Sequence, residues 1–330
     1  MDASLVCRYQ CAFETFAAAG HSREDAVRIM RKSVKLAHEA RRRFWEGGQA
    51  ADREKRAVKI ALSMGPFGAT LSPAQEFDGL YPPPYGPKGY TTDSEDRNMN
   101  AFPDTVEGQR LAAESIEKLA EFHFGRLQVF ADDAETWEMI DLVAFETVPL
   151  SREIKAIRRA VGKLQRELAG RGTETKRWWV STVWPDGRCP EERRPGGDRV
   201  SPREVVHALL DEDGAGTFQG TPRPWGIGIN CTSLDHLAPL LIEFTNATCS
   251  FSSSASQADG LACGLSEWRR YVRVGDGWAL RYWEFVKTAV EDGSVWSGVV
   301  VGGCCRTGPA EIEALADRVR DKVSTSSDLK

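Results

Sequence analysis

The chain has 330 residues, 41% hydrophobic and 28% charged, a composition typical of a soluble globular protein and unlike a disordered or fibrous one. The net charge is −5, and basic runs such as residues 41–43 lie beside acidic residues, so we exclude a nucleic-acid partner. No apolar run approaches the roughly 20 residues that span a bilayer, and the first residues show no leader pattern. We therefore expect no membrane association and a cytoplasmic location.

Strand-like and helix-like segments alternate along the chain. Apolar runs rich in β-branched residues indicate strands, and apolar residues at spacings of three and four indicate helices. In chain order, these patterns predict a helix at 22–40, strands at 57–64 and 139–147, a helix at 151–170, a strand at 177–184, a helix from 201, a strand at 225–232, a helix at 234–244, a strand at 296–303 and a helix from 309.

Two of these helices carry boundary signals. Ser151 is expected to cap the helix that follows Pro149, and Gly170 is expected to close it. Further along, residues 201–204 (Ser-Pro-Arg-Glu) have the form of a capping box with proline at the first helical position. Both signals support a sheet whose strands are linked by helices.

Repeated strand–helix units with apolar strands indicate a parallel sheet covered by helices. The two candidate architectures are an open doubly wound sheet and a closed barrel. The sequence has no glycine-rich phosphate turn after its first strand, whereas Glu146, Cys231 and the pair Cys304-Cys305 lie at strand ends. Because barrel active sites are built at the carboxyl ends of strands, we predict an α/β fold of the (β/α)8 TIM-barrel type.

We expect residues 1–330 to form a single barrel domain. Two long segments, at about 66–104 and 185–200, follow predicted strands, and we place both as loops on the active-site face. The last residues, about 324–330, are expected to form a tail.

Three of the eight cysteines, Cys231, Cys304 and Cys305, lie at strand ends. Taken alone, a Cys-Cys pair is more often two packed thiols than a metal site, and the spacing lacks the CxxC pattern of zinc ribbons. Two features favour a metal: the three sulfurs would converge at one barrel mouth, and the pair precedes a helix N-terminus, which favours thiolates. Three thiolates leave one tetrahedral position open, as in catalytic zinc sites.

Five motifs follow one another along the chain. They are YQCAFETF (9–16), SMGPFGATL (63–71), DLVAFETVP (141–149), GINC (228–231) and GGCCRTGP (302–309). Together, and in this order, they resemble the motifs of the homocysteine S-methyltransferase family. The likeness extends over most of residues 5–320, and the two cysteine motifs are its most diagnostic part.

The resemblance implies a Zn²⁺ ion bound by Cys231, Cys304 and Cys305, and transfer of a methyl group to the thiol of homocysteine, giving methionine. A free thiol has a pKa near 8.5, and a bound zinc ion deprotonates it. The expected donor is a sulfonium compound, S-methylmethionine or S-adenosylmethionine, and betaine is the alternative within the family. Cobalamin- or folate-linked versions carry further modules, for which the chain has no room.

Four further residues match the family's substrate positions. Glu146 matches the carboxylate that holds the ammonium group of homocysteine; the alternative is a strand-end carboxylate paired with a lysine or arginine. Ser63, Met64 and Asn230 match positions near the substrate. Asn230 could equally fix the turn beside Cys231.

Two departures from the family pattern affect the expected barrel. The family opens with a strand bearing D-G-[GA] and a helix, whereas eight residues precede Tyr9 here, so we expect strand 1, its helix and part of strand 2 to be missing. At the place of the family's seventh strand, residues 249–260 are polar, so we expect the sheet to be irregular there. A catalytically impaired, zinc-binding relative is therefore the alternative to an active enzyme.

Overall fold

The computed structural model describes residues 3–7, 9–46, 58–211, 221–249, 260–265, 276–291, 296, 298–303 and 307–327. Within these ranges, seven parallel strands form one sheet. The strands are β1 (Ala3–Cys7), β2 (Lys59–Met64), β3 (Leu142–Val148), β4 (Arg177–Val183), β5 (Gly226–Asn230), β6 (Gly260–Leu265) and β7 (Val299–Gly303). The helices are α1 (Phe13–Ala18), α2 (Arg23–Glu46), η1 (Phe67–Thr70), α3 (Val106–Ala131), α4 (Ala134–Met139), α5 (Ser151–Gly170), α6 (Pro202–Leu210), α7 (Leu234–Cys249), α8 (Asp276–Glu291) and α9 (Pro309–Ser327).

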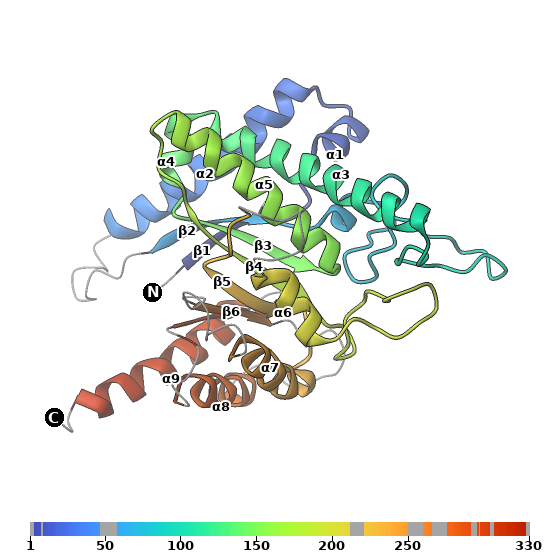
Figure 1. Cartoon of the computed structure of the whole chain (residues 1–330). Helices are drawn as coiled ribbons and strands as arrows, with labels where there is room; N and C mark the ends of the chain where they lie inside the picture. The colour runs from blue at the N-terminus through green and yellow to red at the C-terminus, as the bar shows by residue number, and fades with distance from the viewer. Residues whose placement is uncertain are drawn as a thin grey trace.

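The order of the strands in the sheet decides between the two candidate architectures. The strands lie side by side in chain order, from β1 to β7. A doubly wound sheet requires a point where the strand order reverses, and the described sheet has none. Right-handed crossovers between successive parallel strands place all the helices on the same face. Figure 1 shows the result: α2 to α5 lie above the strands and α7 to α9 below them, because the sheet curves.

The face of the sheet opposite the helices is concave, so side chains from strands that are not neighbours contact one another across it. One apolar cluster on this face joins strands that are not neighbours in the sheet: Ala61, Leu142, Ala144 and Trp179 from β2 to β4, with Trp225 and with Val300 from β7. The larger core lies on the other face, between the strands and the helices. The sheet is thus wound in one direction, as in a barrel. Pairing between β1 and β7 is not among the strand pairings of the described residues, so a barrel of the (β/α)8 type that lacks its first strand stays a prediction.

One expected irregularity of the sheet is corrected, and another stays a prediction. All five residues of β1, the strand before Tyr9, pair with β2. That strand 1 of the family, its helix and part of strand 2 are missing stays a prediction. The sheet also continues past the polar segment 249–260, because β6 begins at Gly260 and pairs in parallel with both β5 and β7. Residues 250–259 themselves lie outside the described residues.

The helix boundaries follow the sequence signals with small corrections. The capping box at 201–204 is confirmed. Helix α5 begins at Ser151 itself, with Leu150 in the N-cap position and no side-chain cap. Its closing glycine is Gly172, which has φ +66°, rather than Gly170, because the left-handed residue lies one position beyond the C-cap. Helix α9 continues through residue 327, into the predicted tail.

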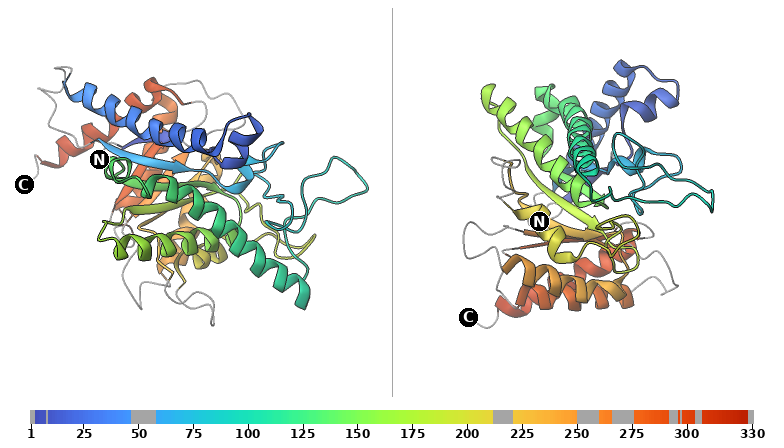
Figure 2. Two further views of the ribbon diagram at one scale, coloured as in Figure 1. Left: turned by 90° about the horizontal axis from the view of Figure 1, so that it is seen from above. Right: turned by 45° about the vertical axis from the view of Figure 1, so that its right-hand side comes forward.

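The two long loops meet at the carboxyl edge of the sheet, since they follow β2 and β4. Asn100 connects them: its amide donates to the carbonyl oxygens of Asp78 (2.7 Å) and Pro190 (2.8 Å) and accepts from the backbone N–H of Glu192 (2.9 Å). Figure 2 shows both loops projecting on the same side of the molecule. No helix in the described part of the chain has the length and apolar character needed to cross a membrane.

Candidate active site

Strand β3 ends in a bulge that carries the predicted carboxylate. The pairing with β4 shifts in register between Phe145 and Val148, so Glu146 and Thr147 together oppose a single residue of β4. Thr147 has φ 60°, a region that a β-branched residue rarely adopts. The bulge therefore turns the end of β3 out of the regular alternation of a strand, and strain of this kind concentrates at functional sites.

Asn230 holds this bulge in place from the end of β5. The backbone N–H of Thr147 donates to Asn230 Oδ1 (2.9 Å), and Asn230 Nδ2 donates to Thr147 Oγ1 (2.7 Å). Cys231 follows with φ 48°, and its buried Sγ lies 3.7 Å from Thr147 Oγ1 and 3.8 Å from Asn230 Nδ2. Asn230 thus fixes the two turns against each other, which is the alternative role considered for it.

Ser63 orients the carboxylate of Glu146. Its hydroxyl, buried at the end of β2, donates to Glu146 Oε2 at 2.5 Å. Burial raises the pKa of Glu146, and the hydrogen bond from Ser63 opposes this shift. Among the ion pairs of the described residues Glu146 has no lysine or arginine partner, so the alternative of a paired strand-end carboxylate finds no support.

Met64 is placed differently from its neighbour Ser63. Its side chain is fully buried in the core between the sheet and the helices. Successive residues of a strand point to opposite faces, and Ser63 takes the concave face. Any contribution of Met64 to a substrate site is therefore restricted to its backbone.

Tyr9 belongs to the same site, although the residue patterns did not single it out. Its hydroxyl forms a hydrogen bond with Thr147, and burial raises its pKa. Arg126 fixes the backbone nearby by donating to the carbonyl oxygens of Tyr9 (3.1 Å) and Gly65 (2.7 Å). A side chain at Gly65 would place its Cβ 2.5 Å from the Tyr9 carbonyl oxygen, so this approach requires glycine. The only sequence signal for Tyr9 is its position at the head of the YQ motif.

A second buried carboxylate, Glu153, holds the loop that follows β2. It accepts hydrogen bonds from the backbone N–H of Phe67 (2.7 Å), from the hydroxyl of Tyr81 (2.7 Å) and from Nε2 of His123 (3.0 Å). Glu153 lies in the first turn of α5, where the helix dipole favours a negative charge. It connects three elements and is a structural centre beside the site.

The predicted metal ligands are described only in part. Cys231 directly follows β5, and β7 ends at Gly303, directly before the pair Cys304-Cys305. Both strands end at the same edge of the sheet, with β6 between them. Cys304 and Cys305 lie outside the described residues. A cluster of three metal-binding side chains does not occur in the described ranges, which contain only one of the three predicted ligands.

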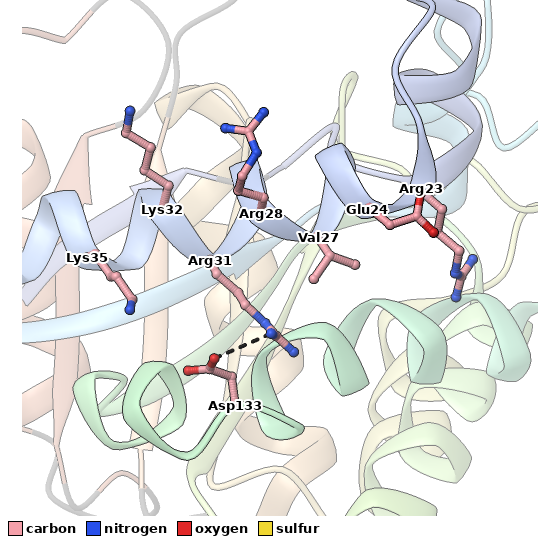
Figure 3. Close-up of a pocket in the computed structure, with 8 residues that line it drawn as sticks. All are labelled: Arg23, Glu24, Val27, Arg28, Arg31, Lys32, Lys35 and Asp133. Atoms are coloured by element: carbon pink, nitrogen blue, oxygen red, sulfur yellow. Dashed lines mark ion pairs between the residues drawn. The ribbon is translucent and has the colours of Figure 1, made fainter.

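A wide groove on the surface does not coincide with this edge. It has a volume of about 680 Å³ and runs along α2, where it is lined mainly by Arg and Lys side chains. Figure 3 shows Arg31 reaching across it to Asp133, with 3.3 Å between the charged groups. None of the predicted site residues lines the groove. We therefore do not place the active site there.

Comparison with known proteins identifies the family of the chain. The family model of homocysteine S-methyltransferase matches residues 5–319. The chain belongs to this family. It is 28% identical to homocysteine S-methyltransferase YbgG of Bacillus subtilis, over 98% of the chain and 81% of the relative. It is 26% identical to homocysteine S-methyltransferase 2 of Arabidopsis thaliana, over 96% and 78%.

The fold of this homocysteine S-methyltransferase is shared with a solved structure. The metallated form of the homocysteine methyltransferase MmuM from Escherichia coli matches with a TM-score of 0.61 and 24% identity, over 96% of the chain and 79% of MmuM. Family membership identifies the chain as an enzyme that transfers a methyl group to homocysteine.

Proposed function

We propose that the chain transfers a methyl group from a sulfonium donor, S-methylmethionine or S-adenosylmethionine, to the thiol of homocysteine in a zinc-dependent reaction. The observation that carries the proposal is a pair of contacts at the carboxyl edge of the sheet. There Ser63 orients the carboxylate of Glu146, and the sulfur of Cys231 lies beside the hydroxyl of Thr147. A carboxylate and a buried thiol are thus brought to one place by three strands. Homocysteine carries the matching groups, an ammonium and a thiol.

We assign Cys231, Cys304 and Cys305 as the zinc ligands. The described ligand fits this role, because its sulfur is buried and lies within reach of a hydroxyl and an amide that can donate to a thiolate. Thiolate sulfur is a favoured ligand of zinc, and three such ligands leave a fourth position for the substrate. When bound, zinc supplies the lowered pKa of the homocysteine thiol.

The residues of the chain orient the reaction. Glu146 binds the ammonium group of homocysteine, and Ser63 keeps its carboxylate in one orientation. Burial raises the pKa of Glu146, so the incoming positive charge stabilises the ionised form. The homocysteine sulfur attacks the methyl carbon in line with the bond that breaks, and the bonding electrons remain on the donor sulfur, which becomes a neutral thioether. The thiol proton passes to solvent, so no protein base is required.

Zinc content and methylation measured together test this proposal. We expect about one zinc per chain and formation of methionine from homocysteine and S-methylmethionine. Cys231→Ser should lose most of the zinc, because a neutral hydroxyl replaces a thiolate. Cys189→Ser is the matched control, since Cys189 is also buried but its sulfur contacts the carbonyl oxygen of Pro149 at 3.8 Å.

Each contrary outcome has a separate meaning. Full zinc retention in Cys231→Ser shows that the ligand assignment is wrong. Zinc binding without methylation favours the impaired relative. Methylation from betaine and not from either sulfonium compound identifies the alternative donor.

A further inference from the structure

The bulge at the end of β3 turns the side chain of Thr147 away from its regular place. Phe145 packs in the core between the sheet and the helices, so the alternation of a strand would direct Thr147, two residues on, to the same face. Val148 takes that place instead. The left-handed backbone of Thr147, with φ 60°, thus places its hydroxyl beside Asn230 and Cys231 at the end of β5.

The hydrogen bonds of Thr147 leave its proton for the sulfur of Cys231. Asn230 Nδ2 donates to Thr147 Oγ1 at 2.7 Å, and Tyr9, which also bonds this hydroxyl, can donate to its second lone pair. A hydroxyl has only one proton, and that of Thr147 is then directed to Cys231 Sγ, 3.7 Å away. A thiolate carries no proton, so a metal-bound Cys231 can only accept this hydrogen bond.

The backbone of Cys231 is fixed without the side chain of Thr147. Thr232 Oγ1 donates to the carbonyl oxygen of Asn230 (2.9 Å) and accepts from the backbone N–H of Trp184 (3.1 Å), which directly follows β4. These bonds join the residues on either side of Cys231 and hold its left-handed turn, with φ 48°. The hydroxyl of Thr147 therefore acts on the sulfur of Cys231 and not on its main chain.

We propose that Thr147 is a positioning residue that orients the sulfur of Cys231 for zinc. The inference rests on the proposed function, in which Cys231 is a zinc ligand. Groups that orient metal ligands in this way typically contribute about 10- to 100-fold to metal affinity. Because Thr147 follows Glu146 in the same bulge, one feature of β3 places both the substrate carboxylate and the metal ligand.

The zinc affinity of Thr147→Val tests the assignment. We expect competition with a zinc-binding dye to give a dissociation constant about 10- to 100-fold higher than that of the wild type, because valine has the same shape but lacks the hydroxyl. Thr147→Ser keeps the hydroxyl and should bind zinc as the wild type does. Thr248→Val is the matched control: its buried hydroxyl donates to the carbonyl oxygen of Phe244 (2.8 Å) in α7, so zinc affinity should not change.

A merely structural role of Thr147 predicts a different pattern. Both valine variants remove a buried hydroxyl, so the melting temperature of each zinc-free protein should fall, whereas only Thr147→Val should lose zinc affinity. Equal zinc affinities of the wild type and Thr147→Val, an equal loss in Thr248→Val, or no rescue by serine overturns the assignment. Thr147→Ala, which lacks the hydroxyl and has no branch at Cβ to strain a left-handed backbone, replaces the valine variant if that chain does not fold.

The zinc titration also separates this inference from the proposed function, because it requires neither a methyl donor nor turnover. A wild type that binds zinc but forms no methionine refutes the proposed methyl transfer and still tests Thr147. A wild type that methylates homocysteine while Thr147→Val keeps full zinc affinity refutes the role of Thr147 alone. A wild type that binds no zinc refutes both.

Discussion

Two carboxylates at the carboxyl edge of the sheet, Glu153 and Glu146, lie in opposite environments. Glu153 is fully buried and accepts hydrogen bonds from Phe67, Tyr81 and His123. Glu146 keeps some exposed surface, and among the described residues the donor to its carboxylate is Ser63. A carboxylate that already accepts three hydrogen bonds within the fold has little capacity left for a ligand, whereas one with a single donor can still bind one.

The difference indicates that Glu153 stabilises the fold and that Glu146 is available to bind a ligand. The charge of Glu153 is compensated within the fold, and its removal leaves three donors without an acceptor. The charge of Glu146 is compensated only in part, as the raised pKa indicates. Substitutions should therefore act on different quantities: the free energy of unfolding for Glu153, and substrate affinity for Glu146.

The largest effect is expected for Glu153→Ala. Removing one member of a buried, hydrogen-bonded charged network typically lowers the free energy of unfolding by about 3–5 kcal/mol. Urea unfolding of the wild type and the variant measures the loss. Glu135→Ala, which removes an exposed ion pair with Lys35, is the control and should have no measurable effect. If both variants lose the same amount, Glu153 is not a structural centre.

The next largest effect is expected for Glu146→Gln, which should weaken substrate binding without lowering the stability of the fold. Homocysteine affinity should fall by about 10- to 150-fold, equivalent to about 1.5–3 kcal/mol, because a charge-assisted hydrogen bond is lost. The free energy of unfolding at neutral pH should be unchanged or higher: a raised pKa in the folded state means that ionisation of Glu146 disfavours folding. Calorimetry with homocysteine and urea unfolding measure both quantities. Unchanged affinity would move Glu146 to a structural role.

The sequence predicts the regular part of this architecture well. The apolar strands β2 to β5 and the capping box of α6 follow from local patterns that the tertiary structure does not override. Helix α3 was not predicted, although Leu119, Leu127 and Phe130 line its buried side, because it follows a long loop and begins with an isolated cap at Thr105. Strand β6 was also not predicted, since glycine and alanine give its segment a weak strand pattern.

The site itself was predictable only where motifs mark it. Glu146 and Cys231 stand at the ends of apolar strands, so their placement at one edge follows from parallel topology. The positive φ of Thr147 could not be predicted, because threonine gives no sign of a left-handed conformation and the contacts of Asn230 hold it there.

The smallest expected effect is on the pH dependence of stability, through His123, which contacts Glu153. Burial lowers the pKa of His123, although the hydrogen bond to Glu153 opposes this shift. The neutral ring therefore donates from Nε2 to Glu153, and its buried Nδ1 has no partner in the described part of the structure.

Since the unfolded chain binds a proton near pH 6.5 that the folded chain does not, stability is fully present above that pH and declines as the pH falls below it. The decline is at most about 1.4 kcal/mol per pH unit for one proton. His123→Gln keeps a donor for Glu153 but cannot titrate, so its unfolding free energy should depend less on pH between about 5 and 7. Urea unfolding across this range compares the two slopes. Equal slopes would mean that the pKa of His123 is the same in the folded and the unfolded chain. A wild-type stability that rises relative to the variant as the pH falls would mean that His123 is protonated in the fold, and Glu153 would then be one half of an ion pair.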